Sequence, residues 1–274
     1  MLVVSLGDLV LDVAVRLEGP VARGADTPAH VSLSAGGQGA NVAAWVASLG
    51  GRSRWLGKRA ADAQGRLVAE QLASVGVELC GPVAAQGNGV IVSLVEPGGE
   101  RSMFPDRGVA TLLEPVELRP VWLVCDHLHV SGYALLAEPV VRAALRAIDV
   151  ARMSGARVSV DLSSWSAIRD AGAERFRGLV ESLGPDVVFA NEEEDEIFGG
   201  PLPGVTWILK RGVHGCSFGG DERAALAVPE VVDTTGAGDA LAAGWIVGGP
   251  DLALEAAARC VQRTGSMPEP ATGI

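Results

Sequence analysis

The chain has 274 residues, of which 48% are hydrophobic, and a formal net charge of −11. This length suits one large α/β domain or two small ones, and a single core is the simpler expectation. The acidic balance excludes nucleic acid as the main partner, because binding to a phosphate backbone needs a basic surface. No apolar run approaches the roughly 20 residues of a membrane span, so no membrane partner is expected.

The beginning of the chain, MLVVSLGDLV, is typical of a buried strand. It lacks the basic leader and the cleavage site of a secretory signal, so we expect a cytoplasmic protein. The four cysteines form no CxxC pair, and neither a zinc knuckle nor a redox motif is indicated.

Short Val-rich runs recur along the chain, and segments with helical spacing separate several of them. This alternation predicts a mainly parallel sheet covered by helices. The runs are residues 2–6, 90–95, 121–125, 157–162, 187–190 and 205–209, and the helical segments include 40–49, 65–75 and 139–153.

Two segments, residues 13–37 and 90–108, alternate apolar and polar residues around Gly/Pro turns. Half-exposed antiparallel strands have this pattern, so we expect a small flap beside the main sheet. The apolar positions of residues 90–94 give the flap a face that a second copy commonly covers, which predicts a homodimer. Arg101 lies on a flap strand, where it either reaches over a substrate or is an ordinary surface arginine.

Residues 191–198, NEEEDEIF, begin with a helix-capping pattern. Asn191 suits an N-cap, and Glu194 three residues later completes a capping box. Acidic side chains in a first helical turn also interact favourably with the helix dipole. Capping alone explains these residues without any catalytic role.

Two glycine-rich turns each precede an Ala-rich helix, at residues 34–39 and 233–239. Neither matches GxGxxG after an N-terminal strand or GxxxxGK[ST], so both standard nucleotide loops are disfavoured. The second turn, DTTGAGD, follows a strand-like segment, residues 225–232. A glycine turn at a helix start directs unpaired N–H groups and the positive dipole end at one place, which suits a phosphate or an oxyanion.

Gly236, Ala237 and Gly238 are the candidate amide donors of this anion hole. Asp239 beside it makes chemical sense as a base that takes a proton from a hydroxyl while the amides steady the transferred phosphoryl group. The alternative is that Asp239 and the threonines only cap the helix.

With both glycine motifs, the sequence resembles the ribokinase-like (PfkB) family of carbohydrate kinases. GGQGANVA, residues 36–43, resembles the first family signature, and DTTGAGDALAAG, residues 233–244, resembles the second. The resemblance implies one kinase domain over 1–274, a three-layer α/β/α sandwich with a mainly parallel central sheet. Its small β-stranded lid would come from about 13–34 and 90–107. The implied activity is ATP-dependent phosphorylation, with Mg²⁺, of a sugar hydroxyl, expected to be a primary one.

The resemblance also implies roles for single residues. Asp239 matches the catalytic base, and Gly236, Ala237 and Gly238 match the anion hole. For Asn41, helix capping is the alternative to a binding role. The matches to the substrate pocket are Asp12, Gly36, Gly37 and Asn41, with Arg101 from the lid as a further candidate.

Nucleotide and metal roles follow from the same resemblance. In the family, the N-x-x-E pattern sits near Mg²⁺ and the phosphates, often through water, so Asn191 is expected at the nucleotide and Glu194 at the metal. Asp233 and Thr235 match positions that hold a monovalent cation, K⁺, in many relatives. The KRGVHG segment resembles the loop at the nucleotide, with Lys210 or Arg211 toward the phosphates and Gly212 and Gly215 beside ATP, although a hairpin turn explains it nearly as well.

Two other functions remain open at this point. A nucleoside kinase is one, because the family includes such enzymes. Ribose specificity is unsupported, since Leu135 and Leu136 stand where ribose-acting relatives carry a Glu. The second open function is that of a non-catalytic sugar-binding sensor, and the intact turn around Asp239 argues against it.

Overall fold

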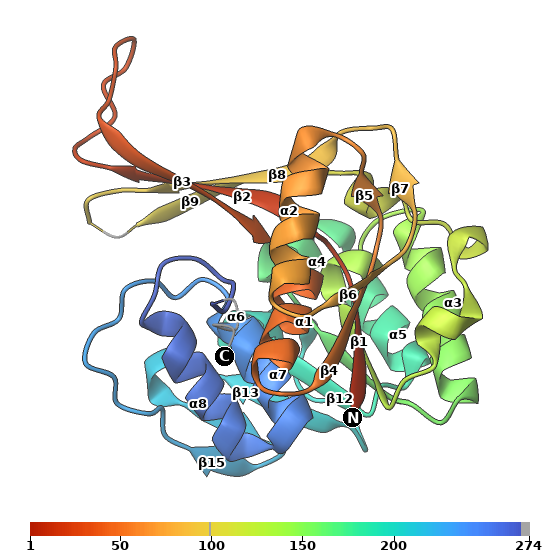
Figure 1. Ribbon diagram of the computed structural model, residues 1–274. Coiled ribbons are helices and arrows are strands. Elements are labelled where there is room, and N and C mark those ends of the chain that lie inside the picture. Colours follow the sequence, from red (N-terminus) through yellow and green to blue (C-terminus); the bar gives the residue numbers. More distant parts are fainter. Residues whose placement is uncertain (99, 270–274) are drawn as a thin grey trace.

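The computed structural model describes residues 1–98 and 100–269. Its centre is a nine-stranded sheet of order β15-β14-β13-β12-β11-β10-β1-β4-β6 (Figure 1). The strands pair in parallel except β14 and β15, which are added antiparallel at one edge. They are Leu2–Leu6 (β1), Arg52–Leu56 (β4), Glu78–Cys80 (β6), His127–Ser131 (β10), Arg157–Asp161 (β11), Val187–Asn191 (β12), Thr206–Lys210 (β13), Cys216–Phe218 (β14) and Asp221–Arg223 (β15).

Helices cover both faces of this sheet, as the alternating pattern predicted. One core contains Val4 and Leu6 of β1 packed with helices α3 and α5, while the other contains Val3 of the same strand packed with α1, α7 and α8. Both faces of a parallel sheet are therefore buried, which explains the nearly continuous apolar runs. The helices are Gln38–Ser48 (α1), Ala63–Ser74 (α2), Val140–Met153 (α3), Trp165–Ala171 (α4), Ala173–Leu183 (α5), Glu192–Phe198 (α6), Ala237–Gly248 (α7) and Pro250–Val261 (α8).

A second sheet of order β3-β2-β8-β9 extends away from the main body (Figure 1). Two antiparallel hairpins, β2 with β3 and β8 with β9, meet in a parallel pair between β2 and β8. This sheet confirms the small β-stranded lid. Its strands are Val10–Leu17 (β2), Ala29–Gly36 (β3), Asn88–Val95 (β8) and Arg101–Gly108 (β9), and a separate short pair joins Arg59–Ala60 (β5) to Val83–Ala84 (β7).

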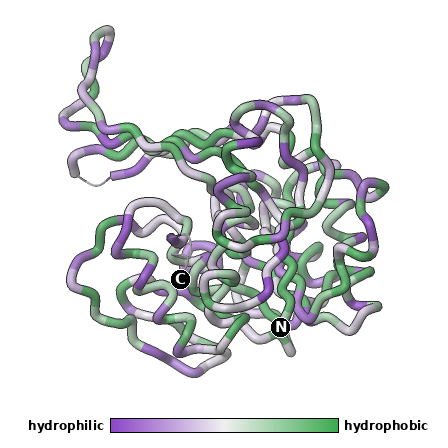
Figure 2. Tube along the Cα trace, in the orientation of Figure 1, coloured by the Kyte–Doolittle hydropathy of each residue, from purple (hydrophilic) through white to green (hydrophobic). Residues whose placement is uncertain are grey.

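The lid has one apolar face. The register places Leu33, Val13, Val92 and Phe104 in a single row across the four strands. Leu33 is 53% exposed and Phe104 is 58% exposed, so this row is open to solvent. Figure 2 shows that the lid strands contain both hydrophobic and hydrophilic stretches. The face opposite carries Asp12.

Two of the predicted strands are wrong. Residues 121–125 contain the end of a 3-10 turn, Pro120–Leu123, because a proline at its first position starts a turn and removes a ladder donor. The strand lies further on, at β10, where two histidines alternate with apolar residues. Residues 225–232 are an extended connection without sheet pairing, and the strand before them ends at Arg223. The other 3-10 turns are Val109–Leu112, Pro115–Glu117, Gly132–Leu135 and Gly212–His214.

Within the described part of the chain, no helix has the length and the apolar character that a membrane crossing requires.

Candidate active site

The turn before α7 is built to bring backbone amides close to a ligand. Gly236 caps the helix with φ +77°, a left-handed conformation that favours glycine. A Cβ on Gly236 would lie 2.6 Å from Cβ of Ser266, so a side chain does not fit there. The N–H groups of the first turn have no partner within the helix, although that of Ala237 donates to the Thr234 carbonyl oxygen at 3.3 Å. The turn thus has the geometry of an anion hole.

Asp239 lies on the first turn of α7 and is held by a chain of side chains. Asn41 Nδ2, on α1, donates to Asp239 Oδ2 at 2.7 Å, and Ser266 Oγ donates to Asn41 Oδ1 at 2.9 Å. Burial raises the pKa of Asp239 to about 7, helped by the carboxylate of Asp161 and opposed by the Asn41 hydrogen bond. A carboxyl group that titrates near neutrality suits a general base.

Lys210 brings a positive charge to the same turn. Its Nζ forms an ion pair with Asp161 Oδ2 at 2.7 Å, with side chains 14% and 1% exposed. A Cβ on Gly238 would lie 3.3 Å from Lys210 Nζ, so the ammonium group faces the anion hole. Burial opposes the charged form, but the carboxylates of Asp161 and Glu194 outweigh it and raise the pKa of Lys210 above its usual value. The turn therefore faces a permanent cation.

The predicted capping box is present. Asn191 Oδ1 accepts from Glu194 N at 2.7 Å, and Glu194 Oε2 accepts from Asn191 N at 2.9 Å. Glu194 is buried, and burial raises its pKa to about 7 against the influence of Lys210. The cap occupies one carboxylate oxygen, which leaves the other for a water of a hydrated Mg²⁺. The remaining oxygen of Glu194, beside Lys210, fits the metal that accompanies ATP.

Where the lid meets the main body, Asp12 faces Gly36 and Arg107 faces Asp8. A Cβ on Gly36 would collide with the Asp12 carboxylate, so this glycine makes room for it. Among the described residues the Asp12 carboxylate accepts no hydrogen bond, and burial raises its pKa to about 7. The Arg107 guanidinium is ion-paired with Asp8 and lies 3.5 Å from the centre of the Tyr133 ring. Gly37, with φ +95°, approaches the Asp8 backbone too closely for any side chain.

Arg101 and Asp233, predicted for substrate and for K⁺, contact each other. Arg101 Nη2 lies 2.6 Å from Asp233 Oδ1. The same carboxylate accepts from Thr235 N at 2.9 Å and from Gly265 N at 3.1 Å, as well as from the Thr235 hydroxyl. Burial opposes its ionisation, but these hydrogen bonds lower the pKa of Asp233 to about 2. The lid is thereby tied to the loop that leads into the anion hole.

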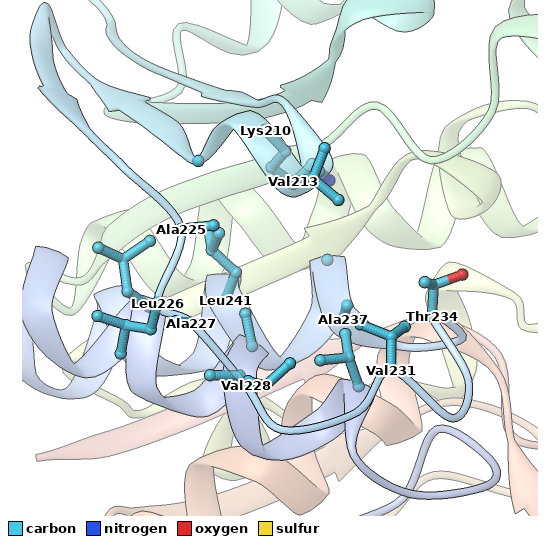
Figure 3. A pocket seen from close by; sticks show the side chains of 17 residues that line it. Lys210, Val213, Ala225, Leu226, Ala227, Val228, Val231, Thr234, Ala237 and Leu241 are labelled. Atoms are coloured by element: carbon cyan, nitrogen blue, oxygen red, sulfur yellow. The ribbon is translucent and has the colours of Figure 1, made fainter.

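A pocket of about 450 Å³ adjoins the anion hole (Figure 3). Lys210, Gly212, Gly215 and Gly238 are among the residues that line it, and the remaining lining is mostly apolar. Pockets of this size with few polar groups suit a flat heteroaromatic ring. The apolar lining comprises Val213, Ala225, Leu226, Ala227, Val228, Val231, Ala237, Leu241, Leu254, Ala257, Ala258 and Val261.

Several residues at the site were missed by sequence reasoning. Gln38 Oε1 accepts from the hydroxyls of Ser131, at the end of β10, and of Ser163, after β11, which are 93 and 125 residues away in the chain. Asp161 is the most informative omission, because it lies near the end of a predicted strand and ends β11, and polar residues at the carboxyl end of parallel strands gather at ligand sites. Gln38 and the serines carry no comparable signal.

Comparisons with known proteins identify the family of the chain. The model of the family described as pfkB family carbohydrate kinase matches residues 1–268, so the chain belongs to this family of ATP-dependent sugar kinases. Fructokinase-1 of Oryza sativa subsp. japonica is 33% identical over 264 residues, which cover 87% of this chain and 80% of that protein. The ATP-dependent ribose-1-phosphate kinase of Halopiger xanaduensis is 31% identical over 280 residues, covering 94% and 90%.

Solved structures confirm the ribokinase-like fold. The adenosine kinase from Sinorhizobium meliloti superposes with a TM-score of 0.83 at 23% identity, covering 97% of this chain and 95% of that one. A sugar kinase from Pyrococcus horikoshii, solved in complex with ATP, gives a TM-score of 0.82 at 21% identity, covering 97% and 94%. The family membership that the two glycine motifs indicated and the predicted three-layer fold are thus both confirmed.

Proposed function

We propose that this carbohydrate kinase transfers the terminal phosphoryl group of ATP to a hydroxyl, expected to be primary, of a neutral sugar. Asp239 takes the proton of that hydroxyl, and the amides of Gly236, Ala237 and Gly238 together with Lys210 stabilise the phosphoryl group in transit. The observation that carries this proposal is the geometry of the α7 turn, where Asn41 holds the Asp239 carboxylate and Lys210 Nζ faces Gly238.

The nucleotide is assigned to the apolar pocket beside that turn. The adenine would lie among the apolar side chains of Figure 3, with Gly212 and Gly215 at the edge and the phosphates toward Lys210. Glu194 would hold Mg²⁺ through water, with Asn191 fixing that carboxylate through the capping box. When bound, the metal neutralises phosphate charge.

The charges at the substrate end favour a neutral molecule. Asp12 is free to accept hydroxyl hydrogen bonds, as carboxylates in sugar sites do. The two arginines of lid strand β9, Arg101 and Arg107, are each ion-paired with an aspartate of the protein. A substrate phosphate or carboxylate would have to compete with Asp233 or Asp8 for them. Fructose, the substrate named for the rice relative, is therefore the first compound to test.

A coupled ADP-release screen with MgATP tests this function. The compounds are fructose and ribose as neutral sugars, adenosine as a nucleoside, and ribose 1-phosphate as an anionic sugar. We expect turnover with a neutral sugar and little with ribose 1-phosphate. Preferred turnover of adenosine would replace the proposal by a nucleoside kinase. Tight sugar binding by calorimetry without any turnover would replace it by a sensor.

The open apolar row on the lid supports a homodimer. Leu33 and Phe104 expose more than half of their surface on this face, which is unusual for large apolar side chains that lie in one contiguous row. A second lid packed on this row would remove them from water, at about 25 cal/mol per Å² of apolar surface. The lid is thus assigned two roles, covering the sugar with one face and pairing with its copy through the other.

A further inference from the structure

The Asp233 carboxylate lies where three parts of the chain meet. The carboxylate belongs to the loop that precedes the anion hole. It accepts a hydrogen bond from the amide of Gly265, in the loop after α8, and forms an ion pair with Arg101 of lid strand β9. Asp233 is 9% exposed and Arg101 27% exposed at their side chains, so water screens the pair only partly. The Arg101 guanidinium of the lid therefore places a positive charge beside this loop.

A potassium ion does not fit this arrangement. A carboxylate offers about four lone-pair positions. Three donors already crowd Asp233 Oδ1, namely the Arg101 guanidinium, the Thr235 hydroxyl and the Thr235 amide, and the Gly265 amide donates to Oδ2, where one position is left. A cation added to the same carboxylate would also lie close to the guanidinium, and like charges at contact distance in a partly buried site repel strongly.

We propose that Arg101 is a positioning residue that supplies the fixed cation of the loop before the anion hole, so that catalysis needs no K⁺. The guanidinium holds the Asp233 carboxylate, the carboxylate holds Thr235 and Gly265, and Gly236 follows directly in the chain. The lid must lie over the site for this contact to form. Lid position and anion-hole geometry are thereby coupled. This inference rests on the proposed role of the Gly236–Gly238 amides.

Replacing Arg101 by Gln tests the inference in two salts. Steady-state rates with MgATP and the substrate found in the screen are measured in roughly 100 mM KCl and in choline chloride of equal ionic strength. We expect the wild-type kcat to be the same in both salts. Arg101→Gln should lose about tenfold or more in kcat in choline, the scale of one charged hydrogen bond, and regain part of it in K⁺ or guanidinium chloride. Arg101→Lys should keep more activity than Arg101→Gln.

The control is Arg16→Gln, which removes an exposed arginine from strand β2 of the same lid and should change neither rate nor salt response. Thermal unfolding in the two salts needs no substrate. The wild type should melt at the same temperature in KCl and in choline chloride. Arg101→Gln should melt at a higher temperature in KCl than in choline chloride. If no compound is turned over, the proposed function fails while the melting data still decide the role of Arg101. Activation or stabilisation of the wild type by K⁺ overturns the inference, as does an Arg101→Gln loss that no cation relieves, or no loss at all.

Discussion

Among single residues, Asp239 shows how burial sets chemistry. Water would leave an aspartate fully ionised at neutral pH, whereas its position beside Asp161 and under α1 raises its pKa to about 7. A carboxylate with a pKa near 7 has the base strength that suits a proton acceptor at cellular pH. It also makes the ionised form costly for the fold, because the folded state then binds a proton more tightly than the unfolded chain does.

Stability should therefore depend on pH at this residue. A folded-state pKa above the unfolded value of 3.8 gives a stabilising contribution that is complete below pH 3.8 and is lost as pH rises through about 7. Asp239→Asn keeps the shape and cannot ionise, so its melting temperature should exceed that of the wild type at pH 8. Near pH 4 the difference should vanish. Scanning calorimetry at both pH values checks this, and a variant that melts lower at pH 8 contradicts the raised pKa.

Asp8 offers a second test at this scale, directed at substrate charge. Asp8→Asn removes the carboxylate that occupies Arg107. The released guanidinium can then bind a phosphate with charge-assisted hydrogen bonds. We expect the KM for ribose 1-phosphate to fall by about tenfold, the scale of one such bond, while the KM for fructose changes little. Equal KM values for the phosphate in both proteins would show that Arg107 does not exclude anions.

Among the elements, α8 forms one wall of the apolar pocket to which we assign the nucleotide. Ala257 lines that pocket, while Glu255 of the same helix is exposed. Ala257→Phe places a ring where the adenine is assigned, so the KM for ATP should rise by about tenfold or more, since adenine loses apolar contact worth a few kcal/mol. Glu255→Phe is the matched control, and the KM for the sugar should not change in either variant. An unchanged KM for ATP in Ala257→Phe would place the base elsewhere.

The elements also show what the sequence can reveal. The parallel sheet, the lid and both glycine turns follow from local patterns, because period, turn chemistry and helix starts are encoded within a few residues. Ion pairs such as Lys210 with Asp161 or Arg101 with Asp233 join residues 49 and 132 positions apart. No local pattern encodes such partners. The strand predicted for residues 121–125 is wrong for a related reason, since an apolar run does not reveal whether a sheet partner lies beside it.

At the scale of the whole molecule, the lid should determine the oligomeric state. Phe104 and Met103 are neighbours on β9, similarly exposed, and point to opposite faces of the lid. Phe104→Ser should convert a dimer into a monomer in light scattering after gel filtration, whereas Met103→Ser should leave the dimer intact. A monomeric wild type, or equal effects of the two changes, would contradict pairing through the apolar face.

The most direct test of the whole account is the kcat of Asp239→Asn at pH 8, with MgATP and the sugar that the wild type turns over. The amide keeps the shape and the contact with Asn41 but cannot accept the proton. We predict that kcat falls by about 10² to 10⁴, the usual contribution of a general base, while the KM for sugar stays within about threefold. A variant that keeps most of the wild-type kcat would show that the proton leaves the sugar hydroxyl by another route.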